Sequence, residues 1–229
     1  MHALLLLALA ATPAPQTWSF DAGAAPEVHV TDVNGSITIE GTETGKVSVE
    51  VRQDGSAEKL ASYPVEVKQE GDTVTARLCC GPSEEKSRSC KSPPETHFTL
   101  RVPRGATLEL SAVNAAVRVQ GVSGRQEVSS VNGKVELSGS TKELKVSSVN
   151  GPVTLAPQEV AATEVSTVSG DVRLRLPARA DATVEYSTVG GSFNGRSKSL
   201  GSVTQKYGAG THDVDVSTVS GELQVEPRS

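Results

Sequence analysis

One six-residue phrase constrains the fold of this chain more than any other feature of its sequence. VSSVNG begins at Val128 and again at Val146. Related stretches begin at Leu110, Val165, Tyr186 and Val216, with an outlying copy at Val30. Aligned on the glycine of the phrase, the units fall at positions 115, 133, 151, 170, 191 and 221, so the intervals are 18, 18, 19, 21 and 30 residues. A repeat whose units grow longer by insertion predicts a solenoid, because a solenoid accommodates inserted residues in loops at its rim.

Each unit is better described as two short strands joined at a corner than as a helix. Val128, Val131 and Val135 have the spacing of a helix face, but Gly133 lies within that pattern and Ser, Thr and Val fill most of the rest. Residues 134–137 alternate polar and apolar, as a strand does. A corner at the glycine lets both strands point apolar residues inward, with glycine supplying a positive φ. The expected corner residues are Asn132, Gly133, Asn150, Gly151, Ser169, Gly170, Gly191, Ser220 and Gly221.

Parallel coils and an antiparallel meander are both compatible with such units, because Asn-Gly is also a strong hairpin signal. The recurrence of valine before every corner favours coils, since coils stack like on like. These valines are Val113, Val131, Val149, Val168, Val189 and Val219. Asn114, Asn132 and Asn150 would likewise form an amide ladder between rungs. An 18-residue unit spans roughly 60 Å of extended chain, enough for one turn of a narrow solenoid. We therefore expect an all-β, parallel, β-helix-like solenoid with rungs of roughly 18–21 residues.

The upstream half also has the pattern of strands, with longer excursions between them. Apolar and polar residues alternate in segments 28–30, 37–39, 47–51, 65–67, 74–78 and 98–102. No linker separates the halves, so we expect one domain over residues 18–229. Its irregular part covers residues 18–104 and its regular repeats cover residues 105–229.

The first residues have the features of an export signal. Leu4–Ala11 is an apolar run too short to span a bilayer, and Ala8-Leu9-Ala10 supplies a small-x-small cleavage pattern. The run lacks a preceding Lys or Arg, so a buried N-terminal strand is the alternative. We expect a signal peptide over about residues 1–17, no transmembrane segment elsewhere, and an exported protein that is periplasmic, exposed on the cell surface or secreted.

In an oxidising compartment, Cys79, Cys80 and Cys90 predict one disulfide. One of the first two cysteines would pair with Cys90 and close a polar loop, which would stabilise the fold by roughly 2–3 kcal/mol. The remaining cysteine would be free or would form an intermolecular bond. A metal site with His97 is the alternative, but the spacing fits no zinc pattern.

The charged residues that precede the units suggest a column. In a stack, Glu109, Glu127, Lys145, Glu164, Glu185 and Asp215 would point outward from rungs roughly 4.8 Å apart. Like charges at that distance repel by about 1 kcal/mol in water. We hypothesise that Glu164, Glu185 and Asp215 bind a divalent cation through carboxylate oxygens, the one cofactor that the sequence suggests. The alternative is a solvated face.

Signals of catalysis are weak. The four histidines are scattered, and aromatic residues are few, although Tyr186 and Phe193 share one unit. Residues 56–59, SAEK, match a Ser-x-x-Lys pattern without its companion motifs. The net charge of −5 gives no basic surface for nucleic acid. We expect no enzyme and no nucleic-acid partner.

The chain resembles a family of exported bacterial β-strand-repeat proteins that are labelled "putative adhesins" and have no known function. The resemblance rests on FTLRVPRGATLEL at 98–110, SAVNAAVRVQGVSG, VSSVNGKVELSG and VSTVSGDVRLRLP. It implies a parallel β-helix-like fold and an extracytoplasmic location, and it brings no catalytic residues. The first corner departs from the pattern, because Ala115 and Ala116 replace the expected glycine.

The predicted function is that of a non-catalytic adhesin or cell-envelope scaffold with a protein or glycan partner. One alternative is a periplasmic partner-binding module in envelope signalling, which would use an edge strand or the cysteine loop. The other is a carbohydrate-active enzyme, which would need carboxylates and a basic group to converge in one groove.

Overall fold

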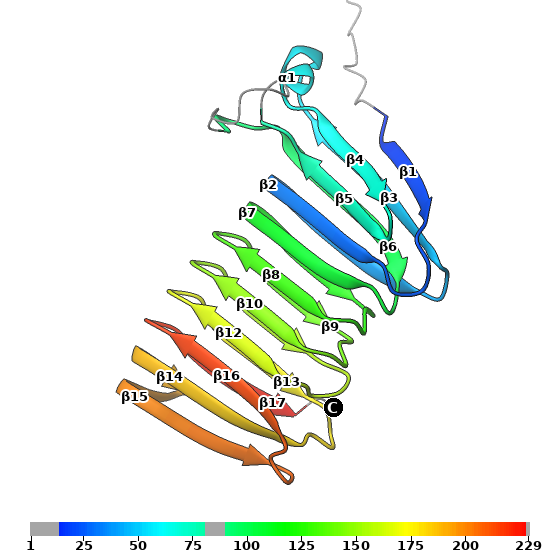
Figure 1. Ribbon diagram of the computed structural model, residues 1–229. Helices are drawn as coiled ribbons and strands as arrows, with labels where there is room; N and C mark the ends of the chain where they lie inside the picture. Colours follow the sequence, from blue (N-terminus) through cyan, green and yellow to red (C-terminus); the bar gives the residue numbers. More distant parts are fainter. Residues whose placement is uncertain (1–13, 81–89, 228–229) are drawn as a thin grey trace, which may run out of the picture.

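The computed structural model describes residues 14–80 and 90–227, and in them the chain forms a β-solenoid (Figure 1). The elements are β1 (Gln16–Asp21), β2 (Glu27–Thr42), β3 (Lys46–Asp54), α1 (Ala57–Ser62), β4 (Val65–Glu70), β5 (Thr73–Leu78), β6 (Glu95–Pro103), β7 (Thr107–Gln120), β8 (Gln126–Ser130), β9 (Val135–Ser138), β10 (Leu144–Ser148), β11 (Val153–Ala156), β12 (Thr163–Thr167), β13 (Val172–Leu176), β14 (Ala182–Phe193), β15 (Arg196–Tyr207), β16 (His212–Thr218) and β17 (Glu222–Pro227). Residues 1–13, most of the predicted signal peptide, lie outside the described residues. Gln16 and Thr17, at its predicted end, are the first residues of β1. No helix in the described ranges is both long and apolar enough to cross a bilayer.

Each regular coil consists of a first strand, a corner and a second strand, and like strands stack in parallel. We call the stack of first strands the first limb and the stack of second strands the second limb. The first limb runs through β8, β10, β12, β16 and β14, and the second through β9, β11, β13 and β17. Within β2, β7 and β14 the chain passes the corner in one continuous strand, so these strands belong to both limbs.

The registers stack like on like, as the repeat predicts. On the first limb Val128 lies beside Val146, and Val146 lies beside Val165. All three side chains are buried and form part of the core between the limbs. Alternate residues along each strand face inward. Valine and leucine at these positions fill a thin core, in which each rung contacts the rung above and the rung below. The parallel solenoid is thus confirmed and the antiparallel meander is excluded for the regular repeats.

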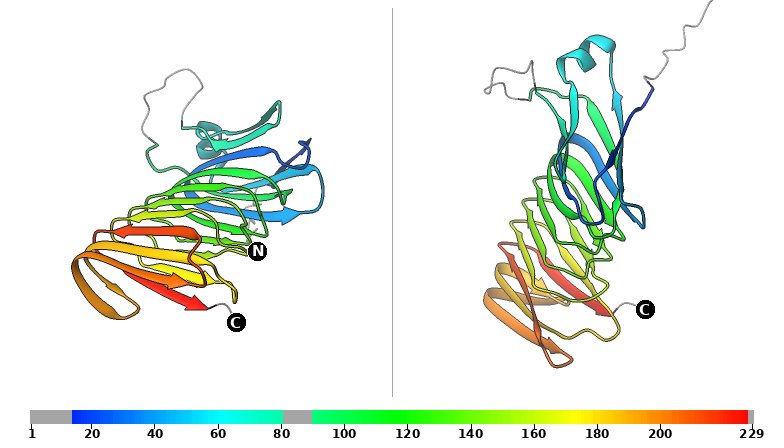
Figure 2. Two further views of the ribbon diagram at one scale, coloured as in Figure 1. Left: turned by 60° about the horizontal axis from the view of Figure 1, so that its bottom comes forward. Right: turned by 45° about the vertical axis from the view of Figure 1, so that its right-hand side comes forward.

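The order of stacking differs from the order along the chain at the C-terminal end. β12 pairs with β16, and β16 pairs with β14, so the last unit of the sequence lies between the two units before it. Beyond β14 the antiparallel β15 covers the end of the stack. The long interval of 30 residues is therefore the β14–β15 hairpin and its return, visible at one end of the stack in Figure 2.

The irregular N-terminal part extends both limbs. β5 and then the antiparallel β4 continue the first limb beyond β2. On the second limb, β6 pairs in parallel with β2. β3 then pairs antiparallel with β6, and β1 pairs antiparallel with β3. The limbs separate at this end, and α1 lies beside it (Figures 1 and 2).

The prediction that the corner glycines supply a positive φ is wrong. They are required for a different reason. Glycines 133, 151, 170, 191 and 221 have no positive φ. A Cβ atom on Gly133 would lie 1.8 Å from the backbone oxygen of Ala115, and one on Gly151 would lie 1.9 Å from the backbone oxygen of Gly133. Rungs therefore approach each other so closely at the corner that only glycine fits. Ala115, which takes the place of the first corner glycine, is fully buried.

Candidate interaction surface

The valines before the corners stack as predicted, but they point outward. Their residues are between 36% and 58% exposed, whereas the hydrophobic residues of the core are at most 8% exposed. In the order of the stack, they are Val113, Val131, Val149, Val168, Val219 and Val189. Together with Leu200, which is 78% exposed, they are all the exposed large hydrophobic side chains of the described residues. We call these seven residues the valine ridge.

Inward-facing hydroxyl groups at the corner explain why the valines face solvent. Ser130 is buried and its Oγ donates to the backbone oxygen of Gly133 at 3.3 Å. In a later rung, the backbone N–H of Gly170 donates to the Oγ1 of Thr167 at 2.9 Å. The hydroxyl group thus satisfies backbone groups of the turn from inside the solenoid. The valine that follows it has the opposite parity and is left outside.

The ridge borders a groove on the N-terminal half of the first limb. The groove has a volume of about 320 Å³. Three columns line it: a column of one threonine and three serines, the buried residues that follow them in the sequence, and the valines. From β2 to β10 they are Thr31, Asp32, Val33, Ser111, Ala112, Val113, Ser129, Ser130, Val131, Ser147, Ser148 and Val149.

At the C-terminal end the ridge continues onto the covering hairpin. β14 and β15 pair before and after Val189 and Leu200, but these two residues are not themselves paired in the strand ladder. Leu200 has a φ of 31°, a left-handed conformation that is unfavourable for leucine. The side chain of Leu200 lies in solvent at the end of the line of valines.

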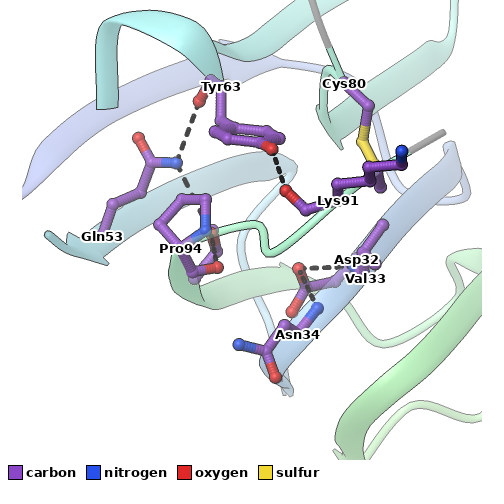
Figure 3. Close-up of a disulfide and its surroundings, with 10 residues drawn as sticks. Asp32, Val33, Asn34, Gln53, Tyr63, Cys80, Lys91 and Pro94 are labelled. Atoms are coloured by element: carbon purple, nitrogen blue, oxygen red, sulfur yellow. Dashed lines mark hydrogen bonds between the residues drawn. A yellow bond between two sulfur atoms is a disulfide. The ribbon is translucent and has the colours of Figure 1, made fainter. Parts of the chain in front are cut away.

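Asp32 lies at the head of the groove, at the position that Ser130 occupies on its own rung. It is fully buried, and its Oδ1 accepts the backbone N–H groups of Val33 at 2.8 Å and Asn34 at 3.3 Å, while its Oδ2 has no partner (Figure 3). Burial raises the pKa of this carboxyl group to about 7, despite the two backbone hydrogen bonds that lower it. The sequence offered no signal for this residue, because aspartate in VTDVNG resembles an ordinary turn residue.

The acidic column exists, and its order is that of the stack. Glu109 pairs with Glu127, Glu127 with Lys145, and Lys145 with Glu164. Asp215 then lies between Glu164 and Glu185, so the insertion brings the three predicted ligands onto adjacent strands. Within the described residues, groups of donor atoms close enough to share a metal ion are Glu27, His29 and Glu109, and Asp54, Glu95 and His97. The predicted trio is not among them, and its binding of a cation stays a prediction.

The structure pairs Cys80 with Cys90 and leaves the Cys79 thiol free (Figure 3). Beside the disulfide, the hydroxyl of Tyr63 donates to the backbone oxygen of Lys91. The Nε2 of Gln53 donates to the backbone oxygen of Tyr63 at 3.1 Å. Burial raises the pKa of the Cys79 thiol, which disfavours its reactive thiolate form. Residues 81–89, most of the predicted cysteine loop, lie outside the described residues.

The residues that suggested catalysis have structural roles. Ser56 caps the N-terminus of α1, with its Oγ accepting the backbone N–H of Lys59 at 3.3 Å, so the SAEK stretch begins a helix. Tyr186 and Phe193 are buried, and their rings lie 5.9 Å apart in the core. They therefore offer no platform to a sugar.

Grooves on the second limb hold carboxylates and basic groups together, so they test the enzyme alternative. One groove contains Arg118, Glu136 and Arg175. A hydrogen bond from Lys134 lowers the pKa of Glu136, which makes that carboxyl group a poor general acid. Another contains Asp171 and Glu222, which accept backbone N–H groups of Glu222 and Gly195, respectively. These carboxylates serve to join rungs.

Comparisons with known proteins agree with the architecture. The sequence profile of the family described as Toastrack DUF4097 matches residues 99–226. A solved "putative cell adhesion protein" from Clostridium sporogenes ATCC 15579 is 12% identical, with a TM-score of 0.50, over 94% of this chain and 100% of its own. A "putative adhesin" from Bacteroides fragilis NCTC 9343 is 14% identical, with a TM-score of 0.37, over 93% of this chain and 97% of its own. No curated protein matches the chain.

Proposed function

The chain belongs to the Toastrack DUF4097 family, and from that premise we propose that it is a non-catalytic exported protein that acts as an adhesin or as a scaffold of the cell envelope. One observation carries the proposal. The exposed large hydrophobic side chains of the described residues form one line, the valine ridge, along the corners of successive rungs, and are not scattered over the surface. Single exposed apolar residues are ordinary in soluble proteins, but a continuous line of them indicates an interaction surface.

The size of the ridge sets the strength of the interaction. Six rungs at a spacing of about 4.8 Å give the valines a length of about 24 Å. Their exposed surface with that of Leu200 is roughly 500 Å², the size of a functional patch on a monomer. A stable protein interface buries about 800 Å² on each partner, so one copy binds weakly. Many copies on one surface bind more tightly through avidity, which suits adhesion or scaffolding.

The chemistry of the ridge favours a protein partner over a glycan. Valine side chains offer dispersion contacts and apolar burial, and these suit the apolar side chains of a protein. A sugar-binding surface would use aromatic platforms, and among the described residues no aromatic side chain belongs to the ridge or lines its groove. The serine column beside the ridge supplies hydroxyl groups for polar contacts at its rim.

Localisation tests the first part of the proposal. Intact cells that produce the full chain are treated with protease, and the chain is followed with an antibody. Cleavage on intact cells, or release into the medium, is expected for an adhesin. Protection would contradict adhesion and favour a periplasmic partner-binding module.

Site-specific photo-crosslinking in the same cells tests the ridge. A photoreactive residue in place of Val131 is expected to form a protein adduct, and Val149→Thr with Val168→Thr is expected to abolish it. Threonine keeps the shape and strand preference of valine, so the fold should persist. The control is a photoreactive residue in place of Thr154, on the second limb of a neighbouring rung. Equal adducts at both positions, or an adduct that survives the threonine substitutions, would contradict the proposed surface.

A further inference from the structure

Three side chains that bind metals in many proteins meet on the outer face of the first limb, at the N-terminal end of the acidic column. His29 of β2 is the direct cross-strand neighbour of Glu109 of β7. Glu27 precedes His29 by two residues on β2, so it points to the same side of the sheet. Neighbouring parallel strands thus hold one imidazole and two carboxylates side by side.

The distances between these groups match those within a metal coordination shell. The Nε2 of His29 lies 3.1 Å from Oε1 of Glu27 and 3.5 Å from Oε2 of Glu109. Ligand atoms bound to one zinc ion at about 2.0–2.1 Å lie about 3.0–3.4 Å from each other. All three candidate ligand atoms lie within 4.8 Å of one another, so rotation of the exposed glutamate side chains would complete the arrangement.

The ring nitrogen at the centre of the cluster has no hydrogen-bond partner. Nε2 of His29 is shielded from solvent, although the side chain as a whole is 34% exposed. In this orientation the shielded Nε2 makes no hydrogen bond with either carboxylate, and a bound cation would satisfy the nitrogen and both carboxylates at once.

The charges around the cluster favour a cation. Among the described residues, His29 is the only ion-pair partner of Glu27 and of Glu109. The next carboxylate of the column, Glu127, is different, because Arg125 lies 3.4 Å from it. Neither carboxylate therefore has a Lys or Arg partner in the described residues, and a divalent ion would supply the missing positive charge.

A second cluster of the same composition provides a contrast. The Nε2 of His97 lies 3.7 Å from Asp54 and 3.8 Å from Glu95. These separations are longer, and Arg52 lies 3.9 Å from the same oxygen of Asp54 and competes for it. This cluster is the weaker candidate and serves as an internal control.

We propose that Glu27, His29 and Glu109 form a surface site for a divalent transition metal ion such as Zn²⁺. Imidazole with carboxylate suits zinc and its neighbours in the periodic table, whereas calcium takes oxygen ligands only. Three protein ligands leave a coordination position open to water, as in zinc sites that are not purely structural. The site is separate from the valine ridge and independent of the proposed function.

Isothermal titration calorimetry of the full, untagged chain with ZnCl₂ at pH 7.5 tests the proposal. The Cys79→Ser background removes the free thiol, which would bind zinc by itself. One zinc ion should bind with a Kd in the micromolar range and raise the melting temperature, and CaCl₂ should produce neither effect. His29→Gln and Glu109→Gln should each weaken binding by at least tenfold, while His97→Gln should leave it unchanged.

Each other result overturns the site. Absence of zinc binding, binding that survives both His29→Gln and Glu109→Gln, or binding lost in His97→Gln would do so. An equal response to calcium would assign the binding to carboxylates alone. If His29→Gln fails to fold, Glu109→Gln decides, because the Glu109 side chain is 60% exposed and contributes little to the core.

Discussion

The side-chain amide of Asn132 donates a hydrogen bond of 2.8 Å to the side-chain oxygen of Asn114, one rung away. The amide of Asn150 in turn donates to the side-chain oxygen of Asn132 at 3.0 Å. The amide ladder predicted from the sequence is thus confirmed. It runs along the corner next to the valine ridge and joins three rungs at equivalent positions, so a shift of register by one residue would break both bonds.

Asn132→Ala should destabilise the fold more than removal of either neighbour in the ladder. Asn132 takes part in both hydrogen bonds, whereas Asn114 and Asn150 each take part in one. We expect a loss of about 1–2 kcal/mol for Asn132→Ala and about half as much for Asn114→Ala or Asn150→Ala. Urea unfolding of the three variants measures this. Equal losses in all three would mean that the ladder does not stabilise the stack.

Much of the regular half could be predicted from the sequence, because one period fixes both the pairing and the face of each residue. Val128 and Val146 could be placed in one buried column from the repeat alone. The outward position of Val131 does not follow from its hydrophobicity, because the buried hydroxyl of Ser130 takes the inward position beside the corner.

The order of the last rungs could not be read from the repeat. Val165 is followed in the stack by Val216 and then by Tyr186, and the repeat gives both units the same pattern. What separates them is the hairpin formed with β15, a contact between distant residues that has no local signal. The two His-centred clusters were missed for a related reason, because Glu27 and Glu109 meet only through long-range pairing.

Gly151→Ala should be among the most damaging single substitutions in the chain. A Cβ atom there would lie 1.9 Å from the backbone oxygen of Gly133, and neither backbone can move without disturbing the next rung. We expect a loss of more than about 3 kcal/mol, or failure to fold. The matched control is Gly190→Ala in β14, where a Cβ atom meets nothing within 4 Å. Circular dichroism during thermal unfolding compares the two, and similar melting temperatures would show that the corner tolerates a side chain.

Asp32→Asn should stabilise the protein at neutral and alkaline pH but not in acid. The pKa of Asp32 is raised from 3.8 to about 7 in the folded state, so its stabilising contribution is fully present below pH 4 and is lost as the pH rises through 7. Asparagine can keep the bonds from the N–H groups of Val33 and Asn34 without becoming charged. We expect a gain of roughly 2–4 kcal/mol at pH 8 and no gain at pH 4.

Asp181→Asn is the control of opposite sign. Hydrogen bonds from the backbone N–H and the hydroxyl of Thr211 lower the pKa of Asp181. Its contribution is therefore present above its unfolded pKa and is lost as the pH falls through the folded value. Denaturant unfolding of both variants from pH 4 to pH 8 measures the difference. A pH-independent effect of Asp32→Asn would contradict the assignment of the buried charge.

Asp215→Asn should stabilise the stack at low ionic strength. Asp215 lies between Glu164 and Glu185 on adjacent strands, so it faces a like charge on both sides. We expect a gain of about 0.5–1 kcal/mol that salt reduces, because exposed charges are screened. Glu127→Gln is the matched control, since Lys145 and Arg125 offset the charge of its other neighbour, Glu109, and the substitution should gain nothing.

Calcium distinguishes repulsion from a cation site in the same three residues. If the carboxylates bind Ca²⁺, as hypothesised from the sequence, calcium should raise the melting temperature of the wild-type chain. Glu164→Gln with Glu185→Gln should then abolish that rise. Absence of a rise in the wild type would end the cation hypothesis and leave repulsion as the effect of the column. In that case Asp215→Asn stays stabilising, because the relief of repulsion does not depend on an ion.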